Sequence, residues 1–191
     1  MIGGANLEPN TCEVRPDTAD DLASGATLST LLPSAQRACL LSAEMNFWTH
    51  IFTPETWESF CSHGGTVTGF TVRYRRAAEK IAPGDHFLCY TARAATWTGI
   101  LAVTSPCFID RTPIFEPAGD PYIIRFRVEP EITLSLEEGV PIAEVWDRLE
   151  RTRGVTYGKK SWAYKVHLAV SPSPISAHDA AVLSEALRRH A

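Results

Sequence analysis

Two apolar, β-prone runs stand close together at about residues 86–92 and 97–105, separated by the short segment TARAAT. Runs of this length and composition predict a pair of strands. A third run, IIRFRVE at 123–129, alternates apolar and charged side chains, which is the pattern of a strand with one buried face. A small barrel-like sheet is the natural way to close short strands of this kind.

From residue 45 onward, further short strands alternate with short helices. The segments NFWTHIF at 46–52 and TVTGFTV at 66–72 are β-prone. Thr53 followed by Pro54 is typical of a helix start, because a threonine caps the helix and a proline suits its first position. These residues predict a helix at 54–62.

Three more helices are expected from their own local signals. RYRRAAEKI at 73–81 indicates a brief helix. Pro141 starts a helix that Gly154 ends, and Ser176 opens the last one. The apolar residues of the helix after Pro141 recur at helical spacing: Ile142, Val145, Trp146 and Leu149. The sequence therefore predicts an α+β fold of five to six mixed strands with flanking short helices.

Residues 1–44 differ in composition from the rest of the chain and show no clear periodicity. They hold six acidic and two basic residues, so they account for the whole net charge of -4. Residues 45–191 are neutral and strongly patterned. We predict that 45–191 is one domain, and that 1–44 is a disordered extension or that Met45 is the natural start.

The five cysteines are widely scattered, and no two have C-x-x-C spacing. This argues against a disulfide framework and a zinc site, and no cofactor is expected. No apolar run reaches the roughly 18 residues that span a membrane, and the N-terminus carries no secretory signal. We therefore expect a monomeric cytoplasmic protein without a membrane partner.

Basic residues cluster at two places on this neutral body. The segment 73–80 has four basic residues and one acidic residue, and 148–160 has five and one. Such clusters can contact phosphates locally. A solvated charged surface is the favoured alternative for each cluster taken alone.

Four segments follow one another in a specific order. They are FWTHIFTPETW, then VTGFTVRYRRAAEKIAPGDHFLCY, then WTGILAVTSPCFIDRTPIF, and finally a strand that ends in VEP. Together they resemble the EVE domain, a member of the PUA-like superfamily that also contains the YTH readers. The resemblance covers residues 45 to about 186 and implies a PUA-like pseudobarrel.

The resemblance also implies a function. Members of this superfamily are known or suspected readers of modified nucleobases, in which a flipped-out base enters a pocket lined with aromatic side chains. The chain is thus expected to bind nucleic acid carrying 5-methylcytosine, 5-hydroxymethylcytosine or a similar base, DNA before RNA, without catalysis. Because EVE domains also occur fused to nucleases, a separate nuclease is a candidate partner.

Four aromatic residues are candidates for such a pocket. Trp57 lies just after the Thr53 cap, and Phe70 lies where the family often places an aromatic residue near the ligand. Tyr90 and Trp97 flank TARAAT, and Trp97 beside two alanines is the best single candidate for a stacking platform. Core packing is the alternative for each aromatic residue.

Three polar residues complete the candidate site. Arg73 can reach a phosphate or a base edge, or can be solvated. Arg93 stands in the loop between the two strands and is a candidate phosphate contact. Thr53 can offer its hydroxyl to a base edge, although capping the helix is the favoured role.

Two other function classes compete with a base reader. Cys61-Ser62-His63 and Asp85-His86 supply the residue types of a hydrolase, but adjacent side chains point in different directions. The sequence contains none of the common hydrolase or phosphate-loop signatures. A small-molecule or protein-interaction module without catalysis stays open, because a neutral body attracts DNA only weakly at long range.

Overall fold

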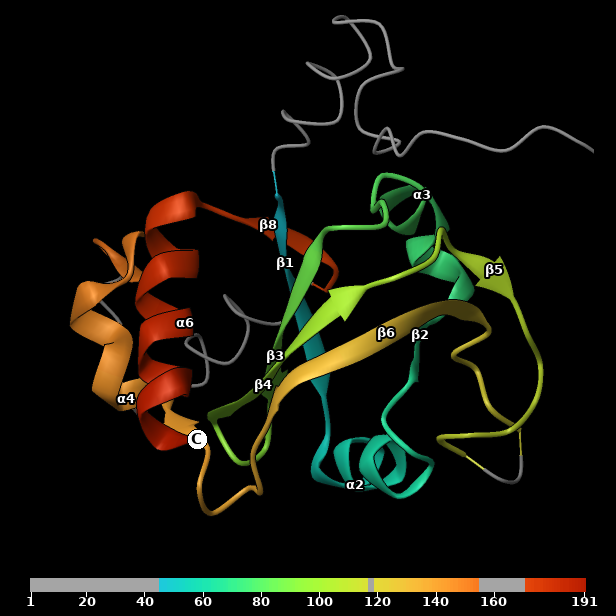
Figure 1. Cartoon of the computed structure of the whole chain (residues 1–191), viewed down its shortest axis with the longest axis horizontal. Coiled ribbons are helices and arrows are strands. Elements are labelled where there is room, and N and C mark those ends of the chain that lie inside the picture. Colours follow the sequence, from blue (N-terminus) through green and yellow to red (C-terminus); the bar gives the residue numbers. More distant parts are fainter. Residues whose placement is uncertain (1–44, 117–118, 155–170) are drawn as a thin grey trace, which may run out of the picture. The chain divides into compact units, whose positions relative to one another are not determined.

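A computed structural model describes residues 45–116, 119–154 and 171–191 (Figure 1). The prediction for residues 1–44 therefore lies outside the described residues, as does the part of the second basic cluster beyond residue 154. The described residues belong to one compact unit, Ala43–Ala191.

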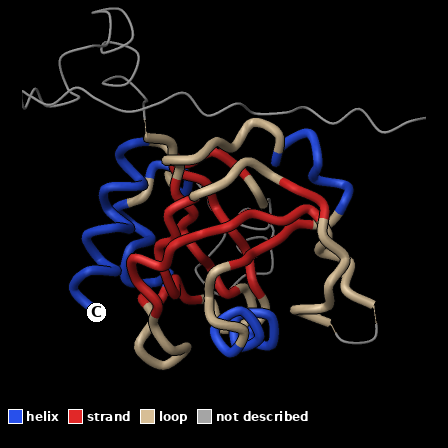
Figure 2. The backbone as a smooth tube through the Cα atoms, turned by 45° about the vertical axis from the view of Figure 1, so that its right-hand side comes forward, coloured by secondary structure: helices blue, strands red, loops and turns tan. Residues whose placement is uncertain are grey.

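The strands form one mixed sheet. They are β1 (Phe47–Phe52), β2 (Val67–Phe70), β3 (His86–Thr91), β4 (Thr96–Val103), β5 (Phe108–Ile109), β6 (Ile124–Thr133), β7 (Val140–Pro141) and β8 (Ser173–Ile175). Their order is β2-β6-β4-β3-β1-β8, with β5 paired to β6 and β7 paired to β4. Strands β1 and β3 run parallel, and the other described pairs are antiparallel. Figure 2 shows the strands curled around a common interior.

Short helices flank this sheet. They are α2 (Pro54–Ser62), α3 (Arg75–Ala78), α4 (Ile142–Val145) and α6 (Ala177–His190), with single 3-10 turns η2 (Val72–Tyr74), η3 (Trp146–Arg148) and η4 (Glu150–Thr152). Helix α2 begins as predicted, because the Thr53 hydroxyl accepts a hydrogen bond from the Thr56 amide and the Thr56 hydroxyl accepts one from the Thr53 amide. The predicted α+β fold is confirmed. In the described ranges no helix has the length and apolar character needed to cross a membrane.

The prediction of a single helix between Pro141 and Gly154 is wrong. The chain forms α4 and then two 3-10 turns, because Leu149 adopts an extended conformation with φ -85° and ψ 136°. The amides of Glu150 and Arg151 donate to the Asp179 carboxylate on α6 instead of continuing a helix. Tertiary hydrogen bonds therefore replace the helical ones that periodicity alone predicts.

Two cores occupy opposite faces of β3 and β4. One, the helix-covered core, packs Leu88, Tyr90, Trp97 and Ile100 with residues of α4 and α6 such as Val145, Leu183 and Leu187. In Figure 1 these two helices lie together beside the strands. The other, the inner aromatic core, contains Trp48, Phe52, Trp57, Phe60, Phe70, Phe87, Phe115 and Phe126. Alternation along β3 sends its side chains to the two cores in turn.

Candidate functional site

A cavity of about 220 Å³ opens where β1 and β2 end, next to the inner aromatic core. Strand β1 supplies His50 and Phe52, and β2 supplies Phe70. The remaining lining residues are Ile51, Thr53, Gly69, Thr71, Arg73, Tyr74, Ala92, Tyr122 and Ser171. The cavity thus gathers aromatic side chains from segments that are far apart in the sequence.

His50 is the aromatic centre of the cavity wall. Its ring stacks between Phe52 and Phe70, with centroid separations of 4.2 and 4.3 Å. Its Nε2 lies 2.6 Å from the Thr68 hydroxyl oxygen. Burial lowers the pKa of His50 to about 3, against a smaller opposing effect of the Ile51 backbone. The ring is therefore neutral at physiological pH, and this wall is aromatic and uncharged.

Gly69 allows the segment before β6 to approach this wall. A Cβ atom at Gly69 would lie 2.5 Å from the Tyr122 carbonyl oxygen and 3.0 Å from the Arg125 side chain. A larger residue would therefore push Tyr122 away from the cavity that it lines. Burial raises the pKa of the Tyr122 phenol, which keeps the hydroxyl protonated near neutral pH.

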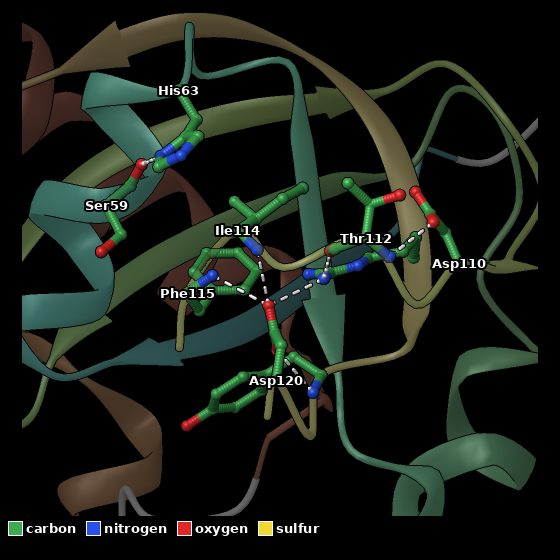
Figure 3. Close-up of polar contacts among 9 residues, drawn as sticks. Ser59, His63, Asp110, Thr112, Ile114, Phe115 and Asp120 are labelled. Carbon is green, nitrogen blue, oxygen red and sulfur yellow. Dashed lines mark hydrogen bonds and ion pairs between the residues drawn. The ribbon is translucent and has the colours of Figure 1, made fainter. Parts of the chain in front are cut away.

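The Asp120 carboxylate holds the loop that carries Tyr122 (Figure 3). It accepts hydrogen bonds from the amides of Ile114, Phe115 and Tyr122 at 2.8–2.9 Å. It also pairs with Arg125 Nη2 at 2.9 Å, and both side chains are fully buried. Burial acts to raise the pKa of Asp120, but the amide hydrogen bonds and Arg125 together lower it. A buried, fully hydrogen-bonded carboxylate therefore fixes this cavity wall.

Three of the predicted site residues lie together on the cavity: Thr53, Phe70 and Arg73. Thr53 also caps α2, as the alternative role required. Phe70 is only 3% exposed and stacks on His50, so it belongs to both the inner core and the cavity wall. The Arg73 side chain is exposed, and its guanidinium carbon lies 4.6 Å from the ring centroid of Tyr74. Arg73 therefore brings positive charge to the rim of an aromatic cavity.

The structure does not bring Trp57, Tyr90 and Trp97 to this cavity. Trp57 is buried, and its indole N–H donates to the Leu134 carbonyl at 3.0 Å. Tyr90 and Trp97 pack against each other in the helix-covered core with ring centroids 5.1 Å apart. Trp97 has no exposed surface on which a base could stack, which corrects its expected role as a platform. For all three residues, the packing alternative describes their position.

Arg93 is exposed and pairs with Glu55 at the start of α2. Its Nη1 lies 2.8 Å from the Glu55 carboxylate, and both side chains are well exposed. A phosphate would have to compete with this carboxylate for the guanidinium.

The side chains that could suggest a hydrolase are engaged separately. Nδ1 of His63 hydrogen-bonds the Ser59 carbonyl (Figure 3), and burial raises the pKa of the Cys61 thiol. A raised pKa disfavours the thiolate that a cysteine nucleophile needs. Asp85 accepts the Trp48 indole N–H, whereas His86 pairs with Glu131. His63 Nδ1 also lies 3.4 Å from the Ser62 hydroxyl, but its shorter contact, 2.8 Å to the Ser59 carbonyl, requires this nitrogen to donate, so it does not act as a base toward Ser62.

The sequence analysis does not identify four aromatic or histidine residues of the cavity: His50, Phe52, Tyr74 and Tyr122. The first two lie in the predicted strand 46–52, Tyr74 lies in the predicted helix 73–81, and Tyr122 directly precedes the predicted strand 123–129. The signal available in the sequence is an aromatic or histidine residue at the end of each such element. Only the fold shows that these ends meet at one cavity.

No protein-family model matches the sequence, and none of the curated proteins is significantly similar to it. Solved structures do share its fold. The YTH domain of Zygosaccharomyces rouxii MRB1, in complex with N6-methyladenosine RNA, is 14% identical with a TM-score of 0.52, covering 78% of this chain and 88% of that one. The Pho92 YTH domain, in complex with m6A, is 8% identical with a TM-score of 0.55, covering 75% and 84%.

A bacterial structure has the same arrangement. Rpa0253 from Rhodopseudomonas palustris is 15% identical with a TM-score of 0.51, covering 76% of this chain and 94% of that one. Identities this low establish similarity of fold alone. The described residues therefore share the fold of these YTH domains, in agreement with the fold that the sequence resemblance implied.

Proposed function

We propose that this chain binds nucleic acid carrying a modified base, with the base flipped out of its strand into the cavity between β1 and β2. The observation that carries the proposal is the cavity itself. It joins an uncharged wall of His50, Phe52 and Phe70 to a cationic rim at Arg73. A flat base suits the partly exposed rings of Tyr74 and Tyr122, which line the same cavity, and its phosphates suit the rim.

The size of the cavity fits a single base. At about 220 Å³ it exceeds the roughly 150 Å³ of an apolar protein cavity that binds benzene. One heteroaromatic ring with a small substituent is therefore a reasonable occupant, which keeps a modified cytosine first. Stacking contributes about 1–3 kcal/mol per base, comparable to the few kcal/mol that flipping costs.

The similar structures support the same class of ligand. Two of them are YTH domains solved with N6-methyladenosine. Because these YTH domains share the fold of this chain, N6-methyladenine is included in the test beside modified cytosine.

Selection for the modification needs more than the burial of one methyl group. Burying a methyl contributes about 0.8 kcal/mol, which is roughly a fourfold preference. A larger preference would come from the shape of the wall that Gly69 and the Asp120-held loop create. The chain acts in this proposal as a reader without catalysis, which agrees with the raised pKa of the Cys61 thiol and with the contact between His63 and the Ser59 carbonyl.

The test is a titration of oligonucleotides that differ at one position. The strands carry cytosine, 5-methylcytosine, 5-hydroxymethylcytosine, adenine or N6-methyladenine, and each is tested single- and double-stranded. Wild type is compared with Tyr74→Ala and Phe70→Leu, both of which alter the cavity lining. Phe108→Ala, a change of a partly exposed aromatic residue on β5 outside that lining, is the matched control.

We expect one modified base to bind better than its unmodified counterpart, and both cavity variants to lose that preference. Thermal unfolding separates this loss from misfolding, which matters most for Phe70 because its ring is buried. Equal binding of every oligonucleotide by wild type, or a preference that survives both cavity changes, contradicts the proposal.

A small-molecule module is the second candidate, favoured by the neutral charge of residues 45–191. The same cavity would then hold a nucleoside-sized ligand without phosphates. Binding through phosphates weakens steeply with salt, whereas binding of a free nucleoside does not. Affinity measured at two salt concentrations therefore distinguishes the two candidates.

A further inference from the structure

A second, shallow groove adjoins the cavity. Its lining residues come from the segment after β2 and from segments that precede β6: Thr71, Val72, Arg73, Arg111, Asp120, Pro121 and Ile123. Thr71 and Arg73 also line the cavity. Because the two share these residues, the groove adjoins the cavity rim and extends to Arg111 and Pro121, which do not line the cavity.

The groove carries two guanidinium groups without carboxylate partners. Within the described ranges, Arg73 and Arg111 form no ion pair, unlike Arg75, which pairs with Glu79 at 2.9 Å. Arg73 therefore differs from Arg75 of the same basic cluster, whose charge is compensated by Glu79. Unpaired guanidiniums on a groove are suited to an anion, and to a phosphate in particular because of their planar fork of donors.

Asp120 is the acidic residue of the groove lining, but its carboxylate is fully buried and does not oppose an anion strongly. Asp120 already accepts from the Arg125 guanidinium and from three backbone amides, at Ile114, Phe115 and Tyr122. Its charge is compensated by Arg125, whose side chain is completely buried behind the groove. The net charge offered by the groove is therefore positive.

Val72 adds an exposed apolar side chain to the lining of the groove. Val72 is 55% exposed, although it stands between two residues that line both hollows. Exposed apolar side chains beside arginines fit a nucleotide, because the sugar and base need apolar contact while the phosphate needs charge.

We infer that this groove holds the sugar–phosphate backbone next to the flipped base, with Arg73 on the phosphate at the cavity rim and Arg111 on a phosphate further along. Val72 packs against the neighbouring sugar or base. The inference rests on the proposed function and deepens it, because it assigns the direction in which the strand leaves the cavity. It also resolves the alternatives for Arg73 in favour of a phosphate contact.

The test compares Arg73→Gln and Arg111→Gln with Arg188→Gln. Arg188 is an exposed arginine on α6 that forms no ion pair with the described residues, so its substitution removes the same charge elsewhere. Each protein is titrated with the preferred modified oligonucleotide at about 50 and 200 mM salt, and with the corresponding free nucleoside.

We expect each groove variant to bind the oligonucleotide about tenfold more weakly at low salt and to lower the salt slope by about one. Arg188→Gln should match wild type in both quantities. Arg111→Gln should leave nucleoside binding and base preference unchanged, since Arg111 does not line the cavity.

The outcomes separate the two proposals. If Arg111→Gln behaves like Arg188→Gln, or if wild type binds only the nucleoside, the groove does not hold the backbone. If the groove variants lose salt-dependent binding while wild type ignores base modification, the groove stands and the modified-base proposal fails. If wild type binds neither the oligonucleotide nor the nucleoside, both proposals fail.

Discussion

Two aromatic pairs lie near strand ends in this domain, and they have opposite surroundings. Tyr90 and Trp97 face each other across β3 and β4, under helices α4 and α6. His50 and Phe70 stack across the inner aromatic core, beside an open cavity. The first pair is tilted, with ring centroids 5.1 Å apart, and the second is stacked at 4.3 Å. The second pair lines a cavity where a ligand could lie, whereas the first is covered by helices. An aromatic pair that helices cover can only pack in the core, whereas a pair beside a cavity can help to form a binding site.

Replacing Trp97 should produce the largest loss of stability. Its side chain is completely buried, and truncation of a buried tryptophan costs about 3–5 kcal/mol. We expect Trp97→Ala to lower the free energy of unfolding by about 4 kcal/mol, measured by urea denaturation.

Trp97→Phe provides the milder companion variant. It should keep the fold and bind the modified oligonucleotide as wild type does, because residue 97 does not line the cavity. A folded Trp97→Phe protein that has lost base preference would instead place the helix-covered pair in the site.

Removing the Asp120 charge should be next in magnitude. Asp120→Asn would leave the buried Arg125 guanidinium uncompensated, and breaking a buried pair in this way costs about 3–5 kcal/mol. We expect a loss near 3 kcal/mol in urea denaturation, together with weaker base binding because the loop carries Tyr122. Asp110→Asn is the control, since Asp110 accepts from the backbone of Thr112 outside this pair. Equal small losses for both variants would contradict a special role for Asp120.

The buried His50 should make stability depend on pH. Its folded-state pKa is about 3, below the ordinary histidine value of 6.5, so the unfolded chain binds a proton that the folded chain excludes. Stability should therefore fall by about 1.4 kcal/mol per unit as pH drops below about 6.5, or about 2.5 kcal/mol by pH 4.5. The lowered pKa of Asp120 adds a loss only at lower pH, below the usual carboxyl range.

Unfolding measured from pH 7 to 4.5 checks this expectation. His50→Phe should remove most of the slope while keeping an aromatic ring between Phe52 and Phe70. His63→Gln should keep the slope, because His63 is exposed. A wild-type slope that survives His50→Phe would show that His50 is not buried as described.

The smallest effect is expected at Arg93. Its pairing with Glu55 is exposed on both sides, and such pairs contribute about 0–1 kcal/mol. Arg93→Gln should change unfolding by less than about 1 kcal/mol and should leave the salt slope of binding unaltered. A drop in slope as large as that of Arg111→Gln would extend the phosphate track to the loop between β3 and β4.

Local patterns in the sequence predicted most of the fold. The alternation at 123–129 appears as part of β6, and the Thr53 cap appears at the start of α2. The helix after Pro141 was overestimated, because Asp179 captures amides that periodicity assigns to a helix. Local sequence patterns predict helices and strands, but they do not show when a side chain of a distant helix will take the backbone hydrogen bonds that a predicted helix needs.

The site was predicted only in part, for a related physical reason. Phe70 and Arg73 were identified because the resemblance pointed to their segment, whereas Trp97 was chosen for its place at a strand end. Its cover comes from α4 and α6, more than 40 residues later in the chain. Tyr122 reaches the cavity through the contacts of Asp120, which no local pattern reveals. Which side chains are buried under helices, and which meet at one cavity, depends on the fold and not on the local sequence.

The most direct test of the central claim is an amide and indole chemical-shift titration of the domain with the preferred modified oligonucleotide. We expect the largest shifts at the Gly69, Thr71 and Tyr122 amides and no shift at the Trp97 indole. Saturated binding with shifts centred on the Trp97 indole and the Tyr90 amide, and none at the cavity, would contradict it.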